Sequence, residues 1–506
     1  MAKLSERLAS SLTILKDLQE LEKIAVKSSD LSRTHRERLV RSGFLKEVMR
    51  GWYIPTRPDE PAGESTSWYT SFWDFCVAYL NSRFGKEWSL SPEQSVILHA
   101  GNRAVPRQLL VRAPLARNQT TSLPFDTSIF ETRARMAEEG ELETDTHGLR
   151  LFSIESALMY CPEPFFRNNP VDARAALGTF QDGTALLRRL LDGGHTVVAG
   201  RLAGAFRNIG RDALADDLLA GMRSVGYLVS EQDPFTSPSK LLIPSRQVLP
   251  HVIRLQLMWA SMRETVLEVF PAAPGLPIDS SKYIQRVSEL FINDAYNSLS
   301  IEGYRVSADL IEQIKVGSWQ PEVHAADRQH RDAMAARGYW QAFQSVKKGL
   351  EEVLSGVESG QVAEMAHRNW YRELFAPSVE AGIIRASDLA GYRNQSEFIR
   401  HSKHVPAPHE QLRDLMPAYF DLLSSEESPA VRAVLGHFAF VYIHPYVDGN
   451  GRIARFLMNL LMASGGYPWT IVPVTRRDEY MSALESASVD QDIRPFALFL
   501  ASVLTQ

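Results

Sequence analysis

The stretch HPYVDGNGRIAR, residues 444–455, decides the fold of the C-terminal half of this chain. Before it, Ser428-Pro429 is a typical helix start, and apolar residues then recur at helical spacing. These are Val431, Val434, Leu435, Phe438, Val441 and Tyr442. After it, the same period continues through Ile453, Phe456, Leu457, Leu460 and Leu461, and Gly465-Gly466 ends it. The sequence therefore predicts a helix, a tight loop and a second helix.

The predicted loop carries residue types that suit a phosphate site. Gly449 and Gly451 can aim successive N–H groups at one point beside the positive end of the second helix, so an anion is expected there. Arg452 and Arg455 are three residues apart and share a helix face, so they can address two different phosphates.

Three further side chains complete the predicted chemistry. Asp448 offers a hard oxygen ligand for Mg²⁺, and Asn450 can donate to a phosphate oxygen that gains charge in the transition state. His444 can take the proton from an attacking hydroxyl. We predict catalytic roles for His444, Asn450 and Arg452. A structural role is the alternative for any of them alone, but buried charges at a helix start cost desolvation unless a ligand or partner satisfies them.

With these residues in view, the segment from about 283 to 500 resembles the Fic proteins, whose signature is His-Pro-Phe-x-(Asp/Glu)-Gly-Asn-Gly-Arg-x-x-Arg. The sole departure is Tyr446 in place of Phe, which we expect to affect packing rather than catalysis. The resemblance implies transfer of AMP from ATP to a protein hydroxyl, with Mg²⁺ and release of pyrophosphate. It implies that the glycine turn and Asn450 hold the α-phosphate region, while Arg452 and Arg455 meet the β- and γ-phosphates.

A second motif lies upstream, at the end of a helix predicted near residues 283–303. Ser298, Glu302 and Gly303 match the inhibitory pattern of some Fic proteins, (Ser/Thr)-x-x-x-Glu-(Gly/Asn). The resemblance implies that Glu302 pairs with Arg455 and occupies the place of the γ-phosphate. The alternative is an ordinary surface glutamate before a helix-ending glycine. Some glutamate-bearing relatives remove AMP from targets instead, and that activity stays open.

The segment from Ser396 to Val405 is predicted to form a hairpin or extended edge, with Phe398, Ile399 and Val405 as its apolar residues. The family uses this region as a flap that pairs with the backbone of a target protein by strand addition. Farther on, Arg476, Arg477 and Tyr480 are either walls of the nucleotide site or part of a solvated face.

The composition is that of an ordinary globular chain, 44% hydrophobic and 23% charged over 506 residues, so several domains are expected. Cys76 and Cys161 have no partner at ligand spacing, which argues against a disulfide framework or a zinc site and favours the cytoplasm. We expect no membrane partner, because no apolar run approaches a membrane span. Fic relatives often dimerise, so a homodimer stays open.

The N-terminal end is basic although the whole chain has a net charge of −5. Residues 1–57 hold twelve Lys or Arg against seven Asp or Glu, and four of the arginines lie on one predicted helix: Arg33, Arg36, Arg38 and Arg41. A two-stranded wing closed at Gly51 is predicted to follow. Residues 1–60 thus resemble the winged helix-turn-helix of antitoxin-type repressors, which implies DNA binding through these arginines.

Residues 61–250 are predicted to form an α/β regulatory domain, again similar to the antitoxin-type regulators. It contains an aromatic helix near residues 68–79, strands at 95–98, 109–111 and 149–152, and helices from 171 to 223. The fold class expected is multidomain and mainly α, with residues 251–506 as an all-α Fic domain carrying a β-hairpin flap. Two functions fit: an autoinhibited protein adenylyltransferase, or a DNA-binding regulator whose Fic portion senses nucleotide or modifies its own chain.

Overall fold

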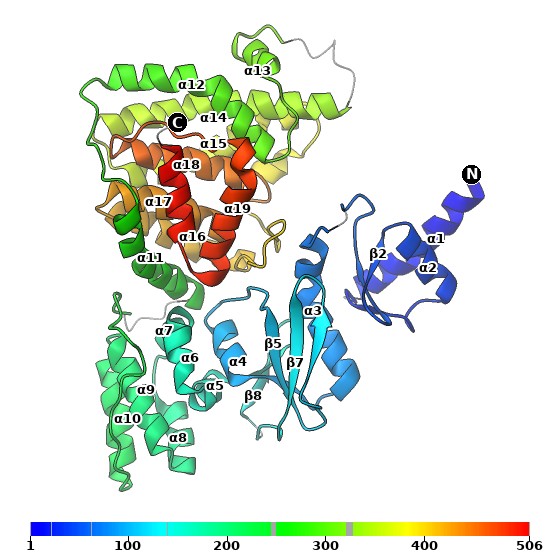
Figure 1. The fold of residues 1–506 in the computed structure, drawn as a ribbon, viewed down its shortest axis with the longest axis vertical. Helices are drawn as coiled ribbons and strands as arrows, with labels where there is room; N and C mark the ends of the chain where they lie inside the picture. Colours follow the sequence, from blue (N-terminus) through cyan, green and yellow to red (C-terminus); the bar gives the residue numbers. More distant parts are fainter. Residues whose placement is uncertain are drawn as a thin grey trace. The chain divides into compact units, whose positions relative to one another are not determined.

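The computed structural model describes residues 2–21, 23–61, 63–138, 140–243, 249–319 and 327–504. The described chain is mainly helical and divides into two compact units (Figure 1). Unit 1 comprises the chain up to Arg254 together with Phe398–Val405. Unit 2 comprises Leu255–Glu397 and the chain from Pro406 onward, and all its described regular elements are helices.

Unit 1 begins with two helices and a small antiparallel sheet. These elements are α1 (Ala2–Glu20), β1 (Val26–Lys27), α2 (Arg33–Arg41), β2 (Leu45–Met49) and β3 (Trp52–Pro55), and the strand order is β1-β3-β2. Helix α2 starts at Ser32, whose hydroxyl accepts a hydrogen bond from the His35 N–H. Gly51, with φ of 83°, closes the turn between β2 and β3.

The arginines of α2 do not all point outward as the DNA-binding prediction requires. Arg36 donates to the Ser28 carbonyl at 3.0 Å, and Arg38 donates to the Ser11 hydroxyl at 2.8 Å. Arg33 is exposed and pairs with Glu37 at 2.6 Å. Both guanidinium groups thus help to hold α2 against its own neighbouring segments, and DNA contact by Arg36 and Arg38 stays a prediction.

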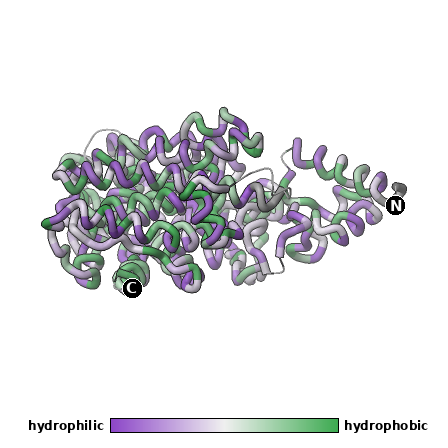
Figure 2. The backbone as a smooth tube through the Cα atoms, turned by 90° about the horizontal axis from the view of Figure 1, so that it is seen from above, coloured by the Kyte–Doolittle hydropathy of each residue, from purple (hydrophilic) through white to green (hydrophobic). Residues whose placement is uncertain are grey.

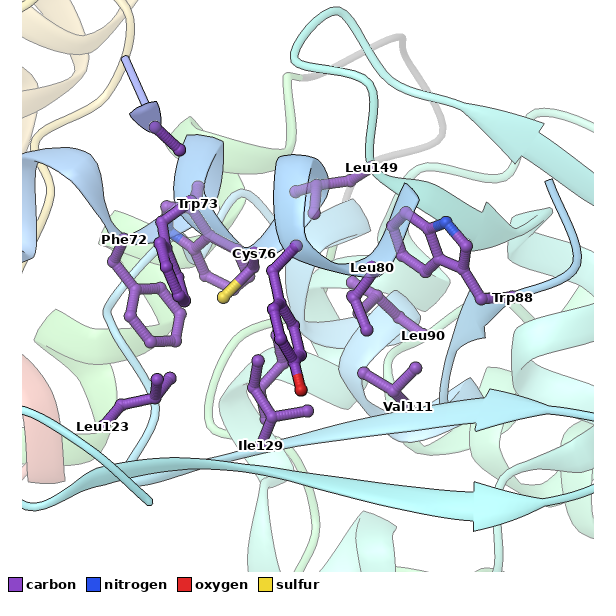
Figure 3. Close-up of a cluster of buried hydrophobic side chains, with 14 of the residues drawn as sticks. Phe72, Trp73, Cys76, Leu80, Trp88, Leu90, Val111, Leu123, Ile129 and Leu149 are labelled. Carbon is purple, nitrogen blue, oxygen red and sulfur yellow. The ribbon is translucent and has the colours of Figure 1, made fainter. Parts of the chain in front are cut away.

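A mixed sheet and an aromatic helix form the centre of unit 1. The sheet has the order β4 (Ser89–Leu90), β5 (Gln108–Ala113), β7 (Thr127–Arg133), β6 (Gln119–Leu123), and only the β5–β7 pair is parallel. Helix α3 (Thr66–Phe84) buries its aromatic residues against this sheet. Figure 3 shows Phe72 and Cys76 of α3 near Leu123 and Ile129 of the strands. The aromatic stripe is thus core, as predicted.

One predicted strand of this region is wrong. Residues 95–98 lie in a helix, α4 (Pro92–His99), because Ser91 and Pro92 form a cap and first-turn pair. The Ser91 hydroxyl accepts a hydrogen bond from the Gln94 N–H at 3.2 Å. The strands predicted at 109–111 and 149–152 correspond to β5 and to β9 (Arg150–Phe152), which pairs with β8 (Leu142–Thr144).

Helices complete unit 1. They are α5 (Ile154–Tyr160), α6 (Glu163–Asn168), α7 (Pro170–Gly178), α8 (Thr184–Gly193), α9 (Thr196–Asn208) and α10 (Asp212–Ser224). Helix α11 (Pro250–Val269) contains the boundary between the two units.

Unit 2 is built from the remaining helices. They are α12 (Ser280–Ile301), α13 (Ala308–Lys315), α14 (Asp327–Leu354), α15 (Ser359–Glu380), α16 (Leu412–Ser425), α17 (Pro429–Ile443), α18 (Asn450–Ala463), α19 (Arg477–Glu485) and α20 (Arg494–Val503). Helices α17 and α18 are the predicted pair around the 444–455 loop. They approach closely at Gly436, where an added Cβ would lie 2.7 Å from Leu461 Cδ1. Core packing therefore fixes both helices, and the loop between them is held at both of its ends.

The predicted β-hairpin between Ser396 and Val405 is not formed. The segment has no strand; it turns at Arg400 and His401, and the Ser402 N–H donates to the Ile399 carbonyl at 3.1 Å. Within unit 1, the Lys403 carbonyl accepts from the Val105 N–H at 2.8 Å, and Val405 packs against the aromatic cluster of α3. The backbone groups of this segment thus bond within a turn, to side-chain hydroxyls and to Val105, and they form no strand ladder.

Hydrophilic and hydrophobic segments alternate along the helices (Figure 2). Across the residues that the structure describes, no helix combines the length and the apolar character needed to traverse a bilayer.

Candidate active site

His444 lies at the end of helix α17 in a backbone conformation that is unusual for a side-chain-bearing residue. Its φ and ψ are 53° and 60°, the left-handed region, and its N–H donates to the Phe440 carbonyl at 3.0 Å. Arg393 holds the turn from outside, since its Nε donates to the His444 carbonyl at 2.9 Å and its N–H to the Pro445 carbonyl at 2.9 Å. The turn ends the helix and fixes the direction of the imidazole.

The surroundings of His444 favour the neutral form of its imidazole. Burial lowers the pKa of His444 from 6.5 to about 4, and the positive charge of Arg393 acts in the same direction. Nδ1 lies 3.4 Å from the Val441 carbonyl, which favours the tautomer with the proton on Nδ1. Nε2 then carries the free lone pair and can accept a proton.

The glycine turn that follows is held by Asn450. Gly449 has φ of 84° and precedes the first residue of α18, and an added Cβ there would lie 2.9 Å from Phe375 Cε2. The Asn450 side chain accepts from the Tyr446 N–H at 2.9 Å and donates to the Tyr446 carbonyl at 2.6 Å. The structure thus gives the Asn450 carboxamide a role that the sequence did not predict, which is to hold the loop in shape.

Arg452 is a buried cation without hydrogen bonds. Its side chain is fully buried, and none of its three guanidinium nitrogens has a hydrogen-bond partner among the described residues. Nη2 lies 3.2 Å from Asp448 Oδ2, and the guanidinium lies 4.8 Å from the centre of the Phe375 ring and 5.2 Å from that of Tyr304. Because unmade hydrogen bonds of a buried charge are costly, this arrangement fits a site that awaits an anion.

Arg455 is buried beside Arg452 but has partners on helix α12. Its Nε donates to the Ser298 hydroxyl at 2.9 Å, and its Nη2 donates to the Ser298 carbonyl at 3.0 Å and to Glu302 Oε1 at 2.7 Å. Burial alone lowers the pKa of Arg455, yet the charge of Glu302 raises it above its ordinary value overall. Nη1 has no hydrogen-bond partner among the described residues.

Glu302 also lies over the glycine turn. A Cβ placed on Gly451 would overlap Glu302 Oε1, so the carboxylate sits at the start of helix α18, where backbone N–H groups attract anions. Gly303 follows in the left-handed conformation with φ of 86° and ends α12. The structure thus brings the upstream motif to the 444–455 loop, and a carboxylate occupies an anion position there.

Asp448 is the predicted metal ligand, and its surroundings fit a cation that is shared with phosphate. It is exposed, one oxygen accepts from the Gly449 N–H at 2.6 Å, and the other faces Arg452. Within the described ranges, no group of three or more acidic, histidine or cysteine side chains could hold a metal ion. One carboxylate completed by phosphate oxygens is the usual environment of Mg²⁺ at nucleotides, and Asp448 suits it.

The structure separates the three residues whose roles were left open. Tyr480 is buried and contacts His437 Nε2 at 2.7 Å, and Arg477 Nε donates to the Ile301 carbonyl at 2.9 Å, so both hold elements around the site. Arg476 pairs with Glu479 and forms part of a surface. Sequence reasoning missed Tyr304 and Phe375; the only available signal was that Tyr304 directly follows the inhibitory motif.

Comparison with known proteins agrees with this geometry. Residues 364–462 match the model of the Fic/DOC family. The chain is 29% identical over 267 residues to a protein adenylyltransferase Fic of Nematostella vectensis, covering 52% of this chain and 58% of the relative. It is 44% identical over 102 residues to a protein adenylyltransferase Fic of Drosophila willistoni, covering 19% of this chain and 20% of the relative.

The chain therefore spans less than two thirds of the length of these relatives. Among solved structures, a segment of Fic-1 from C. elegans is 20% identical, with a TM-score of 0.35, and the match covers 63% of this chain and 88% of that one. The similarity to the family thus rests on the sequence match, which includes the helix, loop and helix that hold His444, Arg452 and Arg455. Over residues 364–462 this chain is therefore similar to the Fic/DOC family.

Proposed function

We propose that this protein is an adenylyltransferase that moves AMP from ATP to a Ser, Thr or Tyr hydroxyl of a target protein or of itself, and that Glu302 keeps it latent. The observation that carries the proposal is the fully buried guanidinium of Arg452, whose nitrogens have no hydrogen-bond partner among the described residues, in the same short motif as His444. The similarity to relatives that are named protein adenylyltransferase Fic supports the same activity.

In the proposed reaction, the hydroxyl oxygen of the target attacks the α-phosphorus of ATP. The bond between this phosphorus and the bridging oxygen of pyrophosphate breaks, and the electron pair leaves with pyrophosphate. The proton of the hydroxyl passes to Nε2 of His444. The negative charge of bound triphosphate raises the pKa of this imidazole above its value in the free protein, which makes it a better proton acceptor.

The other side chains of the site bind and orient the phosphates. The N–H groups at the start of α18 face the α-phosphate region, and Arg452 offers its free donors to the β-phosphate. Mg²⁺ held by Asp448 would neutralise phosphate charge. Asn450 acts by keeping the loop between Tyr446 and Gly451 in shape.

The proposed latency follows from the contact between Glu302 and Arg455. A carboxylate at 2.7 Å from Nη2 competes with the γ-phosphate for the same donor. If this contact favours the blocked state by about 3 kcal/mol, about one molecule in a hundred is competent at any time.

The test is the intact mass of the full chain after incubation with ATP and Mg²⁺. We expect Glu302→Gly to gain AMP far faster than the natural sequence, and the double variant Glu302→Gly/His444→Ala to gain none. Glu289→Gln is the control, because Glu289 is an exposed glutamate on the same helix. Equal labelling of Glu302→Gly and the natural chain would remove Glu302 as the inhibitor, and labelling without His444 would remove it as the base.

Removal of AMP from a modified target is the second activity that this site supports. The charge of the Glu302 carboxylate reaches the His444 imidazole, whose pKa it raises slightly against the dominant effect of burial. Glu302 could therefore position a water for attack on an AMP-modified hydroxyl. An AMP-modified protein incubated with the chain and Mg²⁺ tests this, and release that is lost in Glu302→Gln would favour removal.

DNA binding by residues 1–60, as a winged helix, is a further candidate. It is supported by the exposed Arg33 on α2 and by the hairpin of β2 and β3. A gel shift with the promoter region of the chain's own gene, measured at increasing salt, is the test. We expect Arg33→Gln with Arg41→Gln to weaken the shift; binding that is unaffected by both substitutions and by salt would exclude this interface.

A further inference from the structure

We propose that Tyr304 is a positioning residue that holds Arg452 ready for the nucleotide, and that its effect on activity is opposite in sign to that of Glu302. The proposal rests on the proposed nucleotide-transfer function. It concerns one turn of chain, Glu302-Gly303-Tyr304, which contacts both arginines of the 444–455 motif.

The backbone geometry of this turn explains how neighbouring residues reach two different arginines. Helix α12 ends with two reverse hydrogen bonds, from the Gly303 N–H to the Ser300 carbonyl at 3.0 Å and from the Tyr304 N–H to the Leu299 carbonyl at 3.1 Å. Between them, Gly303 takes the left-handed conformation. This reversal leaves Glu302 on Arg455 and directs the Tyr304 ring to Arg452.

The two contacts use different parts of the arginines. Glu302 accepts a hydrogen bond from Arg455 Nη2 and so occupies a donor that a phosphate would need. Tyr304 lies with its ring centre 5.2 Å from the guanidinium carbon of Arg452, while every nitrogen of that guanidinium remains without a hydrogen bond. A contact through a ring stabilises the cation without using its donors.

Phe375 of helix α15 provides the second aromatic contact. Its ring centre lies 4.8 Å from the same guanidinium carbon, so Arg452 has one aromatic contact from α15 and one from the end of α12. A free arginine side chain loses conformational entropy when it binds phosphate. A side chain that aromatic rings already hold in place loses less of it. We infer that the aromatic contacts prepare Arg452 for phosphate in both the blocked and the open state.

The consequence is that substitutions two residues apart change activity in opposite directions. Removing the carboxylate of Glu302 frees Arg455 and raises AMP transfer. Removing the ring of Tyr304 leaves Arg455 unchanged but loosens Arg452, and so weakens nucleotide binding even when Glu302 is absent. A ring without the hydroxyl, as in Tyr304→Phe, keeps the contact.

The experiment uses the full chain with Glu302→Gly as the parent, and measures AMP transfer at varied ATP. We expect Tyr304→Leu to raise KM for ATP by about tenfold with less than about a threefold change in kcat, whereas Tyr304→Phe stays near the parent. Calorimetric titration with ADP and Mg²⁺ should show the same loss of affinity for the Leu variant. Tyr304→Met, whose unbranched side chain adapts to irregular space, replaces Leu if the Leu variant does not fold.

Tyr296→Leu is the matched control, since Tyr296 is a 40% exposed tyrosine of the same helix without a contact to either arginine in the described structure. The inference is overturned if Tyr304→Leu or Tyr304→Met keeps the KM and ADP affinity of the parent, or if Tyr304→Phe loses as much as they do. A parent that neither transfers AMP nor binds ADP would instead overturn the proposed function itself.

Discussion

Tyr446 is the single residue that departs from the Fic signature, and its hydroxyl has no hydrogen-bond partner in the described part of the chain. The side chain is fully buried, its ring stacks on Tyr371 with centres 3.9 Å apart, and the hydroxyl makes no hydrogen bond with any described residue. Tyr480 is also buried, but its hydroxyl lies 2.7 Å from His437 Nε2. The two tyrosines therefore form a matched pair.

Removal of the two hydroxyls should change stability in opposite directions. Tyr446→Phe removes an unsatisfied buried polar group, so we expect the free energy of unfolding to rise by about 1 kcal/mol. Tyr480→Phe leaves the His437 nitrogen without its partner, so we expect a loss of about 1–2 kcal/mol. Urea denaturation of both variants measures this, and a destabilised Tyr446→Phe would mean that its hydroxyl has a partner.

At the scale of elements, helices α14 and α15 cross where Gly338 leaves room for backbone. A Cβ on Gly338 would overlap the Leu374 carbonyl oxygen, one residue before the Phe375 that contacts Arg452. Gly349 of the same helix faces side chains and no backbone, with Leu460 Cδ1 at 3.2 Å and Val362 Cγ1 at 3.3 Å from an added Cβ. The crossing point thus depends on one glycine and not on the other.

We expect Gly338→Ala to force α14 and α15 apart and to cost roughly 3 kcal/mol, because backbone cannot move aside as a side chain can. Gly349→Ala should stay within about 1 kcal/mol of the natural chain, since the gain in helix propensity offsets a small repacking. Thermal unfolding monitored by circular dichroism compares them. An equal loss of stability in both variants would contradict this expectation, because it would show that α14 and α15 can move apart at Gly338 without extra cost.

The elements also show where sequence patterns succeed. Helices α17 and α18 follow from apolar periodicity and from the cap at Ser428, which are local signals. The strand expected at 95–98 is helix α4, since a short apolar run does not distinguish the two and the Ser91-Pro92 cap decides. The flap expected from 396 to 405 has no ladder, because strand pairing requires a partner that the local sequence does not contain.

At the scale of the whole molecule, buried histidines set the response to acid. Burial lowers the pKa of His367 to about 4 and that of His437 to about 3, both from 6.5. The unfolded chain therefore binds more protons below pH 6.5, and the stability that these groups contribute is present above pH 6.5 and is lost toward pH 4. Asp294 opposes this: burial raises its pKa to about 6 from 3.8, so its contribution is lost as pH rises through 6.

His444 and His251, whose pKa burial also lowers to about 4, act in the same direction as His367 and His437. Asp294 offsets less than one of these four histidines, so a net loss of several kcal/mol is expected between pH 7 and pH 5. Scanning calorimetry of the full chain should show a melting temperature that falls over this range. In His437→Gln the fall should be smaller, because a glutamine does not titrate. A melting temperature that is constant from pH 7 to pH 5 would contradict the proposed role of these histidines.

The sequence by itself determined the helix-loop-helix and the residue types on its loop, because caps, glycine positions and apolar spacing act within a few residues of each other. Only the tertiary structure decided which distant side chains meet there. The resemblance implied the pairing of Glu302 with Arg455, and the structure shows the contact across 153 positions of sequence. Tyr304 and Phe375 contact Arg452, and Arg36 and Arg38 bond to segments next to α2. Such contacts depend on how helices pack after they form, and no local pattern encodes them.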